Sequence, residues 1–212
     1  VSEPLFICLY LPFPKIGAIF VCRKTEILSM SKKKLVLLLI VLLLIIDQAV
    51  KIWVKTHMTL DQRFTVFPNW FFIRFIENPG AAFGFQLGGD YGKLILSIFR
   101  ICAIGALGYY LHVLLRKKAP TGVLVGFTLI LVGAAGNVFD SAFYGLIFSE
   151  STLHGKVVDM LYFPLFSGIY PDWLPGIGGR PFTFFSPIFN LADSYISVGI
   201  IYMLIFQRKF FK

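Results

Sequence analysis

The chain has 212 residues, of which 57% are hydrophobic and only 15% are charged. About a quarter of the residues of a soluble domain are charged, so this composition excludes an ordinary soluble protein and indicates one that lies among membrane lipids. The formal net charge of +9 does not indicate a nucleic-acid partner, because the basic residues flank apolar blocks and form no stripe with interleaved aromatics.

Four apolar segments are long enough to cross about 30 Å of hydrocarbon as helices, which takes roughly 20 residues each. They are residues 35–54, 94–115, 122–140 and 188–206, and the second contains Arg100. The predicted fold is therefore mainly α, an integral membrane protein with four transmembrane helices.

Clusters of basic residues that lack acidic neighbours flank these spans. They lie at 32–34, before the first span, at 116–118, between the second and third, and at 208–212, after the fourth. Cytoplasmic loops carry an excess of Lys and Arg, so both termini and the middle loop are predicted to be cytoplasmic. The connections 55–93 and 141–187 then face outward.

The two outward connections differ in composition. The first has β-forming residues around Pro79 and Gly80, which predicts a small extracytoplasmic β-rich segment on the membrane surface. The second, at 161–185, is rich in Pro, Gly and aromatics, which is typical of an irregular interfacial segment.

Residues 1–29 are predicted to be a separate N-terminal extension. Met30, followed by Ser-Lys-Lys-Lys and an apolar run, is typical of a natural start. We therefore interpret residues 1–29 as an upstream extension that is not native, the alternative being a cleaved targeting segment. Residues 30–212 form the predicted four-helix membrane domain.

The cysteine and histidine residues form no metal-binding pattern. Cys8, Cys22 and Cys102 lack CxxC spacing, and their odd number argues against a disulfide framework. The three histidines form no HExxH motif. The sequence therefore predicts neither a metal site nor a cofactor.

Polar residues inside the spans are functional candidates, because an ionisable group there costs about 2.5–3.5 kcal/mol on insertion scales. Asp47 and Lys51 are four apart in the favourable order for an ion pair, so they form a structural pair or orient a substrate or lipid headgroup. Asn137 and Asp140 share a helix face, either as a buried network that fixes the outer loop or in a catalytic role.

Asp159 and Asp193 are the candidate catalytic pair. The predicted topology brings both to the same membrane depth, and Asn190 shares a helix face with Asp193. Two carboxyl groups close together in a poorly hydrated site do not both ionise easily, so one can act as a general base and the other as a general acid. The alternative is two unrelated acids at the membrane interface.

Four motifs in fixed order identify a family. They are ENPGAAFG at 77–84, GNVFD at 136–140, KVVDM at 156–160 and FNLADS at 189–194, preceded by DQAVK at 47–51. This pattern resembles that of the lipoprotein signal peptidases, the type II signal peptidases, over about residues 30–212.

The resemblance implies a membrane aspartic endopeptidase that needs no metal. Such an enzyme removes the signal peptide from diacylglyceryl-modified prolipoproteins by cutting before the lipidated cysteine. It implies that Asp159 and Asp193 are catalytic. The implied substrate-binding or supporting residues are Asn78, Gly80, Asn137, Asp140, Asn190, Asp47 and Lys51. We expect a monomer in the bacterial inner membrane. It would contact the membrane lipids, and its active site would face the periplasm.

Three departures from the family pattern stand out. Ser141 occupies the position after the GNxxD aspartate where the family commonly has Arg, so the usual partner of Asp140 is missing or replaced. Met160 stands where Phe is usual. The stretch between Asp159 and Asp193 is longer than is typical, which puts the shape of the substrate entrance in doubt.

Two other classes of membrane protein compete with the peptidase. A small transporter or proton pathway also contains intramembrane carboxylates, but the chain shows no inverted repeat and its acids lie towards one face only. A purely structural scaffold leaves the Asn-x-x-Asp patterns at 137–140 and 190–193 unexplained.

Overall fold

The computed structural model describes residues 6–13, 17–24, 30–78, 89–148 and 155–210, and the chain divides into two compact units, Val1–Leu35 and Val36–Lys212. The first unit contains an antiparallel hairpin of β1 (Phe6–Phe13) and β2 (Gly17–Lys24). The division between the units falls within the first residues of helix α1.

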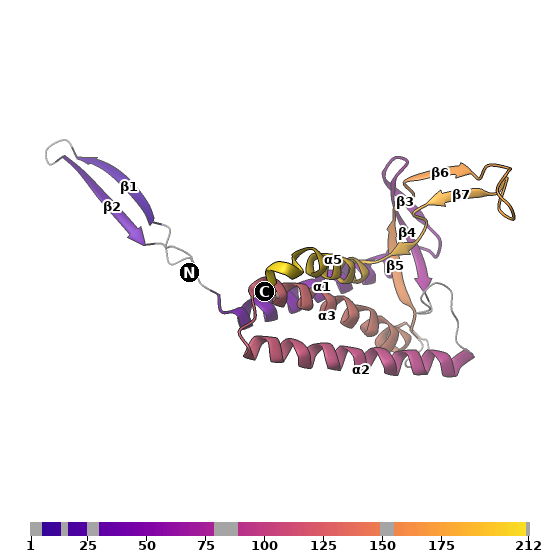
Figure 1. The fold of residues 1–212 in the computed structure, drawn as a ribbon, viewed down its shortest axis with the longest axis horizontal. Helices are drawn as coiled ribbons and strands as arrows, with labels where there is room; N and C mark the ends of the chain where they lie inside the picture. Colours follow the sequence, from indigo (N-terminus) through magenta and orange to yellow (C-terminus); the bar gives the residue numbers. More distant parts are fainter. Residues whose placement is uncertain (1–5, 14–16, 25–29, 79–88, 149–154, 211–212) are drawn as a thin grey trace. The chain divides into compact units, whose positions relative to one another are not determined.

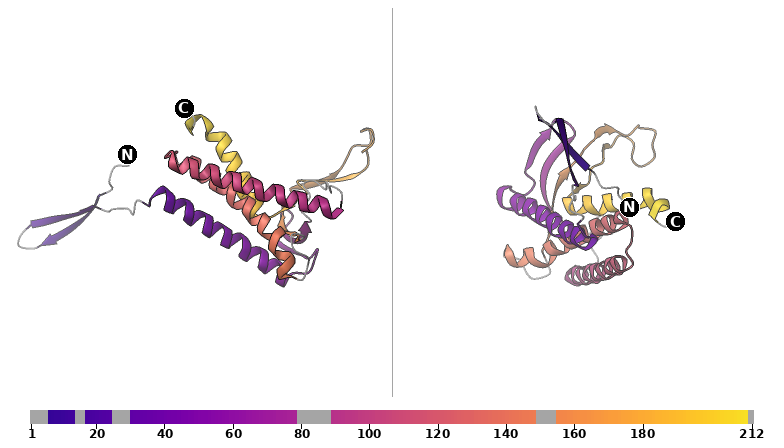
Figure 2. Two further views of the ribbon diagram at one scale, coloured as in Figure 1. Left: turned by 90° about the horizontal axis from the view of Figure 1, so that it is seen from below. Right: turned by 90° about the vertical axis from the view of Figure 1, so that its left-hand side faces the viewer.

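Long helices dominate the second unit, and they run side by side (Figures 1 and 2). They are α1 (Lys32–His57), α2 (Gly89–Arg116), α3 (Thr121–Phe139) and α5 (Leu191–Phe210). Among the described residues, three helical segments are long and apolar enough to cross a membrane: Lys32–His57, Ser97–Arg116 and Thr121–Ile147. The apolar part of α5 is shorter, Leu191–Phe206.

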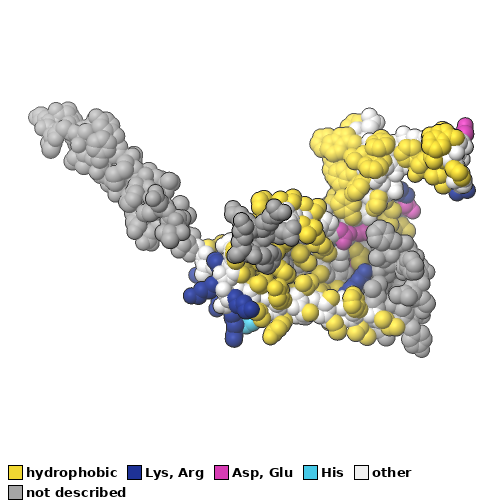
Figure 3. All heavy atoms as spheres, viewed as in Figure 1, with side chains coloured by type: hydrophobic (Ala, Val, Ile, Leu, Met, Phe, Trp, Pro, Cys, Tyr) yellow, Lys and Arg dark blue, Asp and Glu magenta, His cyan; other side chains and the backbone are white. Residues whose placement is uncertain are grey.

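The helices expose large apolar side chains on their outer surfaces. Phe99 of α2 and Ile205 of α5 are each 68% exposed, and apolar side chains cover much of the helical surface in the space-filling view (Figure 3). Such a surface is unfavourable in water, whereas hydrocarbon solvates it well. Together with the apolar helix lengths, this makes the chain an integral membrane protein.

The last helix begins three residues later than the sequence predicts. The predicted span started at Ile188, but Ile188 and Phe189 form strand β8, which pairs with Tyr162 and Leu161. Helix α5 therefore begins at Leu191. Periodicity did not reveal this boundary, because a short apolar run fits a strand and a helix equally well.

Helix α3 continues into a wider turn. The π-helix η2 (Asp140–Tyr144) follows it directly, and α4 (Gly145–Ile147) completes the segment. A π turn contains an extra residue, so it changes which side chains face inward. Here Asp140, Ser141 and Tyr144 are all buried.

A four-stranded antiparallel sheet lies at one end of the helices (Figure 1). Its strand order is β3 (Arg63–Phe67), β4 (Phe71–Asn78), β5 (Val157–Tyr162) and β8. The predicted β-rich segment is present, and the chain reverses between Phe67 and Phe71, where Asn69 has a φ of 73°. The turn predicted at Pro79 and Gly80 falls in residues 79–88, which lie outside the described residues.

The segment between α4 and α5 is more regular than predicted. It contains β5 and β8, and between them the separate hairpin of β6 (Phe166–Ile169) and β7 (Pro181–Phe184). Pro and Gly suggested irregular structure, but most lie in the tip between β6 and β7 or at strand ends, where they do not interrupt the ladder.

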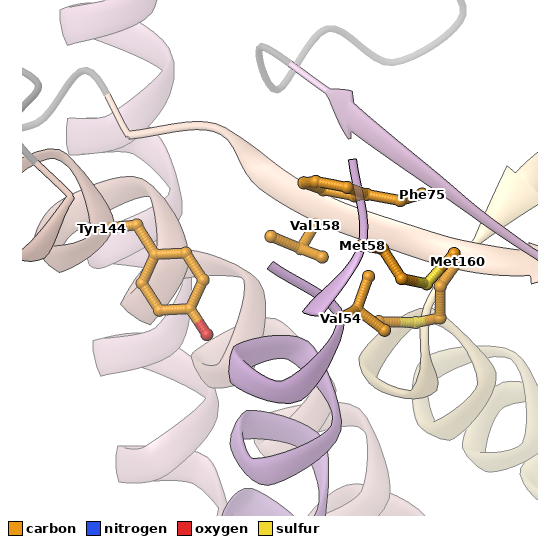
Figure 4. Close-up of a cluster of buried hydrophobic side chains, with 6 residues drawn as sticks. All are labelled: Val54, Met58, Phe75, Tyr144, Val158 and Met160. Carbon is orange, nitrogen blue, oxygen red and sulfur yellow. The ribbon is translucent and has the colours of Figure 1, made fainter. Parts of the chain in front are cut away.

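An apolar cluster joins the end of α1 to the sheet (Figure 4). Val54 of α1 and Met58, which directly follows α1, pack there with Val158 and Met160 of β5. Side chains alternate along a strand, so burial of Val158 and Met160 in this cluster directs Asp159 to the opposite face of β5. The core thus fixes the orientation of the candidate acid.

Helices α3 and α5 approach closely because α3 has glycine at their contact. A Cβ atom on Gly133 would lie 2.2 Å from the carbonyl oxygen of Ala192, and one on Gly136 would lie 2.6 Å from an Asp47 carboxylate oxygen. Small residues commonly permit such close backbone contact between membrane helices. The contact holds the first turn of α5 against α3.

Substitution of Gly133 by Ala therefore tests the α3–α5 contact. We expect Gly133→Ala to lower the free energy of unfolding in detergent by about 1–3 kcal/mol, because the new methyl group forces the backbones apart. Gly105→Ala in α2 is the matched control, since a Cβ there meets nothing within 4 Å. Equal unfolding curves for the two variants would contradict this description of the contact.

Candidate active site

Asp159 lies almost fully buried on β5, between two asparagine side chains. The Nδ2 of Asn78, on β4, donates to its Oδ2 at 3.2 Å. The Nδ2 of Asn190, after β8, donates to its Oδ1 at 2.7 Å. Sheet pairing produces this arrangement, because β4 and β8 are the two neighbours of β5.

Asp193 lies in the first turn of α5, where it forms a reciprocal cap with Asn190. The backbone N–H of Asp193 donates to Oδ1 of Asn190 at 2.9 Å, and the backbone N–H of Asn190 donates to Oδ2 of Asp193 at 3.4 Å. This is a capping box built from Asn and Asp. The Nδ2 of Asn137, on α3, donates to the other oxygen of Asp193 at 2.7 Å.

Two asparagines connect the two candidate acids. The Nδ2 of Asn190 donates both to Asp159 and, at 3.0 Å, to Oδ1 of Asn137. Asn137 in turn donates to Asp193. The structure thus brings residues from β5, α3 and α5 into one hydrogen-bonded group, as the predicted topology required.

The surroundings of Asp159 favour its protonated form. Burial raises the pKa of Asp159 to about 7, and the negative charge of Asp193 adds to this shift. The amides of Asn78 and Asn190 and the charge of Lys51 act in the opposite direction. Such a carboxyl group can hold a proton near neutral pH and give it to a reacting group.

Lys51 connects the two carboxylates of the helical region. Its Nζ lies 3.0 Å from Asp47 and 2.8 Å from Asp140, and it donates to Oδ1 of Asn137 at 3.1 Å. The ion pair expected four residues apart on α1 is therefore present. All three charged groups are fully buried. The ammonium group of Lys51 thus has an oxygen atom from each of these three side chains within 3.1 Å.

Asp47 also contacts the N-terminus of α5. Its Oδ1 accepts the backbone N–H of Ala192 at 3.0 Å, although 145 positions separate the two residues. The N-terminal N–H groups of a helix have no partner within the helix, and a carboxylate is favoured there. Asp47 therefore holds the turn that carries Asp193.

Ser141 does not pair with Asp140, although it occupies the position where the family commonly has an arginine partner for that aspartate. Its hydroxyl donates to the backbone oxygen of Asn137 at 3.1 Å. Asp140 is paired with Lys51 and accepts a hydrogen bond from Nε2 of Gln48 at 2.9 Å. The sequence did not single out Gln48, although it lies within the DQAVK motif.

A further ion cluster lies beside the sheet. Glu77, next to Asn78 on β4, pairs with Lys55 of α1 and, at 3.0 Å, with Lys156 at the start of β5. Burial acts to raise the pKa of Glu77, but the hydrogen bonds and charges of the two lysines prevail and lower it. The cluster connects α1 to the strands that carry Asn78 and Asp159.

Three further features bear on the predicted site. Arg100 of α2 lies within electrostatic range of Asp193, and the only signal in the sequence was a charged residue in an apolar run. Gly80 falls outside the described residues. Across the described ranges, no three His, Cys, Asp or Glu side chains lie close enough together to hold a metal ion.

Comparison with known proteins assigns the family. The family model described as signal peptidase (SPase) II matches residues 39–209. A lipoprotein signal peptidase of Porphyromonas gingivalis is 50% identical over 76% of this chain and 77% of that protein. One of Amoebophilus asiaticus is 41% identical over 77% of this chain and 73% of that protein.

Solved structures give the same result. Two structures described as a bacterial membrane enzyme, determined by the in meso method at 2.3 and 1.9 Å resolution, are each 28% identical to this chain. Both cover 82% of it, and this chain covers 88% and 93% of them, with TM-scores of 0.58 and 0.57. The chain is therefore a peptidase that belongs to the signal peptidase II family.

Proposed function

We propose that this protein removes the signal peptide from diacylglyceryl-modified prolipoproteins by aspartic catalysis, with Asp159 and Asp193 as the catalytic pair. The family assignment supports the reaction itself. The single observation that carries the catalytic assignment is the hydrogen-bonded group that unites the two carboxyl groups through Asn190 and Asn137. The peptide bond cut is the one that precedes the lipidated cysteine.

In the proposed mechanism, Asp193 is the ionised base and Asp159 the protonated acid. Asp193 takes a proton from a water molecule, whose oxygen attacks the peptide carbonyl carbon. Asp159 gives its proton to the leaving nitrogen as the carbon–nitrogen bond breaks. The water proton thus ends on Asp193 and the acid proton on the new amine. Proton exchange with water then restores both carboxyl groups.

The environment of each acid supports this division of roles. Asp193 lies at the positive end of α5, and it accepts hydrogen bonds from the backbone N–H of Asn190 and from the side-chain amide of Asn137. Arg100 adds a positive charge within range. Asp159 is more deeply buried, and its pKa is raised to about 7.

We further propose a four-span topology in the bacterial inner membrane. Helix α5 would be the fourth span, both termini would be cytoplasmic, and the catalytic pair would face the periplasm. The α2–α3 connection, which contains Arg116, Lys117 and Lys118, lies at the end of the helices away from the sheet (Figure 1), which supports this orientation.

The same topology suggests how a monomer would select its substrate. The diacylglyceryl chains would lie in the membrane against the exposed apolar helix surfaces, while the peptide reaches the carboxyl groups. Burial contributes roughly 0.8 kcal/mol per CH₂ group. Lipidated precursors would therefore bind far more tightly than unlipidated ones.

The catalytic assignment predicts the effect of removing either carboxylate. Asp159→Asn and Asp193→Asn should each reduce cleavage of a lipidated precursor by a factor on the order of 10² to 10⁴, because one proton transfer loses its carrier. Both amides keep the size of the side chain, so the variants should still insert in the membrane. Turnover is measured by the release of signal peptide in detergent.

Asp61→Asn is the matched control for these variants. Asp61 is an exposed carboxylate paired with Arg74 outside the spans, so its removal should leave turnover unchanged. Near-normal cleavage by either active-site variant would rule out the proposed pair.

The raised pKa of Asp159 predicts a pH dependence. The acid must be protonated to act, so kcat/KM is retained below pH 7 and falls as the pH rises through about 7. Measurement of kcat/KM between pH 5 and pH 9 gives the pH at which this fall occurs. A rate that stays level up to about pH 9 would show that Asp159 is not the proton donor.

Asn78→Ala should move the fall in kcat/KM to higher pH. The Asn78 amide stabilises the ionised form of Asp159 and so lowers its pKa. Its removal raises the pKa and moves the fall in kcat/KM to higher pH. Thr65→Ala on the exposed strand β3 is the control, and it should not change the pH at which kcat/KM falls. A shift to lower pH would contradict the assigned contact.

A further inference from the structure

The buried cluster beside the catalytic group has an excess of negative charge. Asp47 and Asp140 are both fully buried, and Lys51 is the cation that pairs with both. Two carboxylates and one ammonium group leave one negative charge without a counterion in this cluster. Such a charge is costly in a poorly hydrated interior unless hydrogen-bond donors surround it.

The side-chain amide of Gln48 is placed between the two carboxylates. Its Nε2 donates to Asp140 at 2.9 Å and to Asp47 at 3.1 Å, and it lies 3.3 Å from the backbone oxygen of Gly136. One neutral group thereby supplies donors to both acids. The amide works in this way only if its nitrogen, and not its oxygen, faces them.

Tyr144 sets the orientation of this amide. Its hydroxyl donates to Oε1 of Gln48 at 3.0 Å, so the oxygen end of the amide is held away from the carboxylates. Figure 4 shows the hydroxyl of Tyr144 directed towards α1, while the ring packs beside the apolar cluster. Tyr144 is 1% exposed, and the π turn η2 directs it inward together with Asp140.

We infer that Tyr144 is a positioning residue for the reaction, and that it acts through Gln48 on the buried Asp47–Lys51–Asp140 cluster. This inference rests on the proposed function, because its consequence is the placement of Asp193. It concerns two side chains that do not touch the reacting atoms.

The contacts that lead from Tyr144 to Asp193 follow two routes. Along the first, Gln48 holds Asp47, and Asp47 accepts the N–H of Ala192 next to Asp193. Along the second, Gln48 holds Asp140, which pairs with Lys51; Lys51 donates to Asn137, and Asn137 donates to Asp193. Both routes end at the first turn of α5.

A double-mutant cycle tests the inference. Tyr144→Phe removes only the hydroxyl group and should lower kcat for a lipidated precursor about 3- to 10-fold, the effect of one buried neutral hydrogen bond. KM should stay unchanged, because no substrate contact is lost. In a Gln48→Met background the same change should alter kcat less than 2-fold, because the acceptor is already absent.

Thr128→Val is the matched control for a lost buried hydroxyl. Thr128 is fully buried, and its hydroxyl donates to the backbone oxygen of Leu124 within α3, away from the cluster. This variant should keep the kcat of the unmodified enzyme. The free energy of unfolding in detergent is also measured for the four proteins of the cycle. It gives the interaction energy between Tyr144 and Gln48 even if the Gln48→Met variant turns over too slowly for kcat to be measured.

Several results would overturn the inference. A Tyr144→Phe variant with unchanged kcat would do so, and so would an equal loss of kcat in both backgrounds. Additive changes in unfolding free energy would show that Tyr144 contributes only packing. These outcomes are distinct from a failure of the proposed function, in which the unmodified enzyme itself would leave the lipidated precursor uncut.

Discussion

The structure depends on one buried cation. Lys51 has no exposure to solvent, and its ammonium group lies within 3.1 Å of Asp47, Asp140 and Asn137. Transfer of an ammonium group from water to such a site costs several kcal/mol unless every donor is used. The contacts of Lys51 with these three side chains therefore tie α1 to α3, and Asp47 extends this connection to α5 through Ala192.

The hydrogen-bonded group that contains Asp159 and Asp193 lies where this polar cluster meets the sheet. The helices supply Asn137 and Asp193, whereas the sheet supplies Asn78 and Asp159. Asn190 lies at the junction, because it follows β8 and caps α5. One asparagine thus fixes both the start of a helix and the separation of two acids. The neighbouring apolar cluster packs against the face of β5 opposite Asp159 and so holds this strand in position.

The sequence predicts three long apolar helices that the structure contains, because a long apolar run is a local signal. The positions of Asp159, Asp193, Asn137 and Asn190 in one group followed from topology and from the family resemblance. The start of α5 was wrong by three residues, since strand pairing with β5 decided the structure of residues 188–189. Strands β6 and β7 were also missed, because they lie in a segment rich in Pro and aromatics.

The contact between Gln48 and Tyr144 could not be predicted, because the two residues are 96 positions apart. It also depends on the π turn, which determines that Tyr144 faces inward.

The pairing of β5 with β8 has its own consequence for the evolution of this chain. Tyr162 and Ile188 form the last pair before the β6–β7 hairpin and close the base from which it extends. Loop length adds little to closure entropy, so this hairpin is free to lengthen or shorten among relatives while the two acids keep their separation.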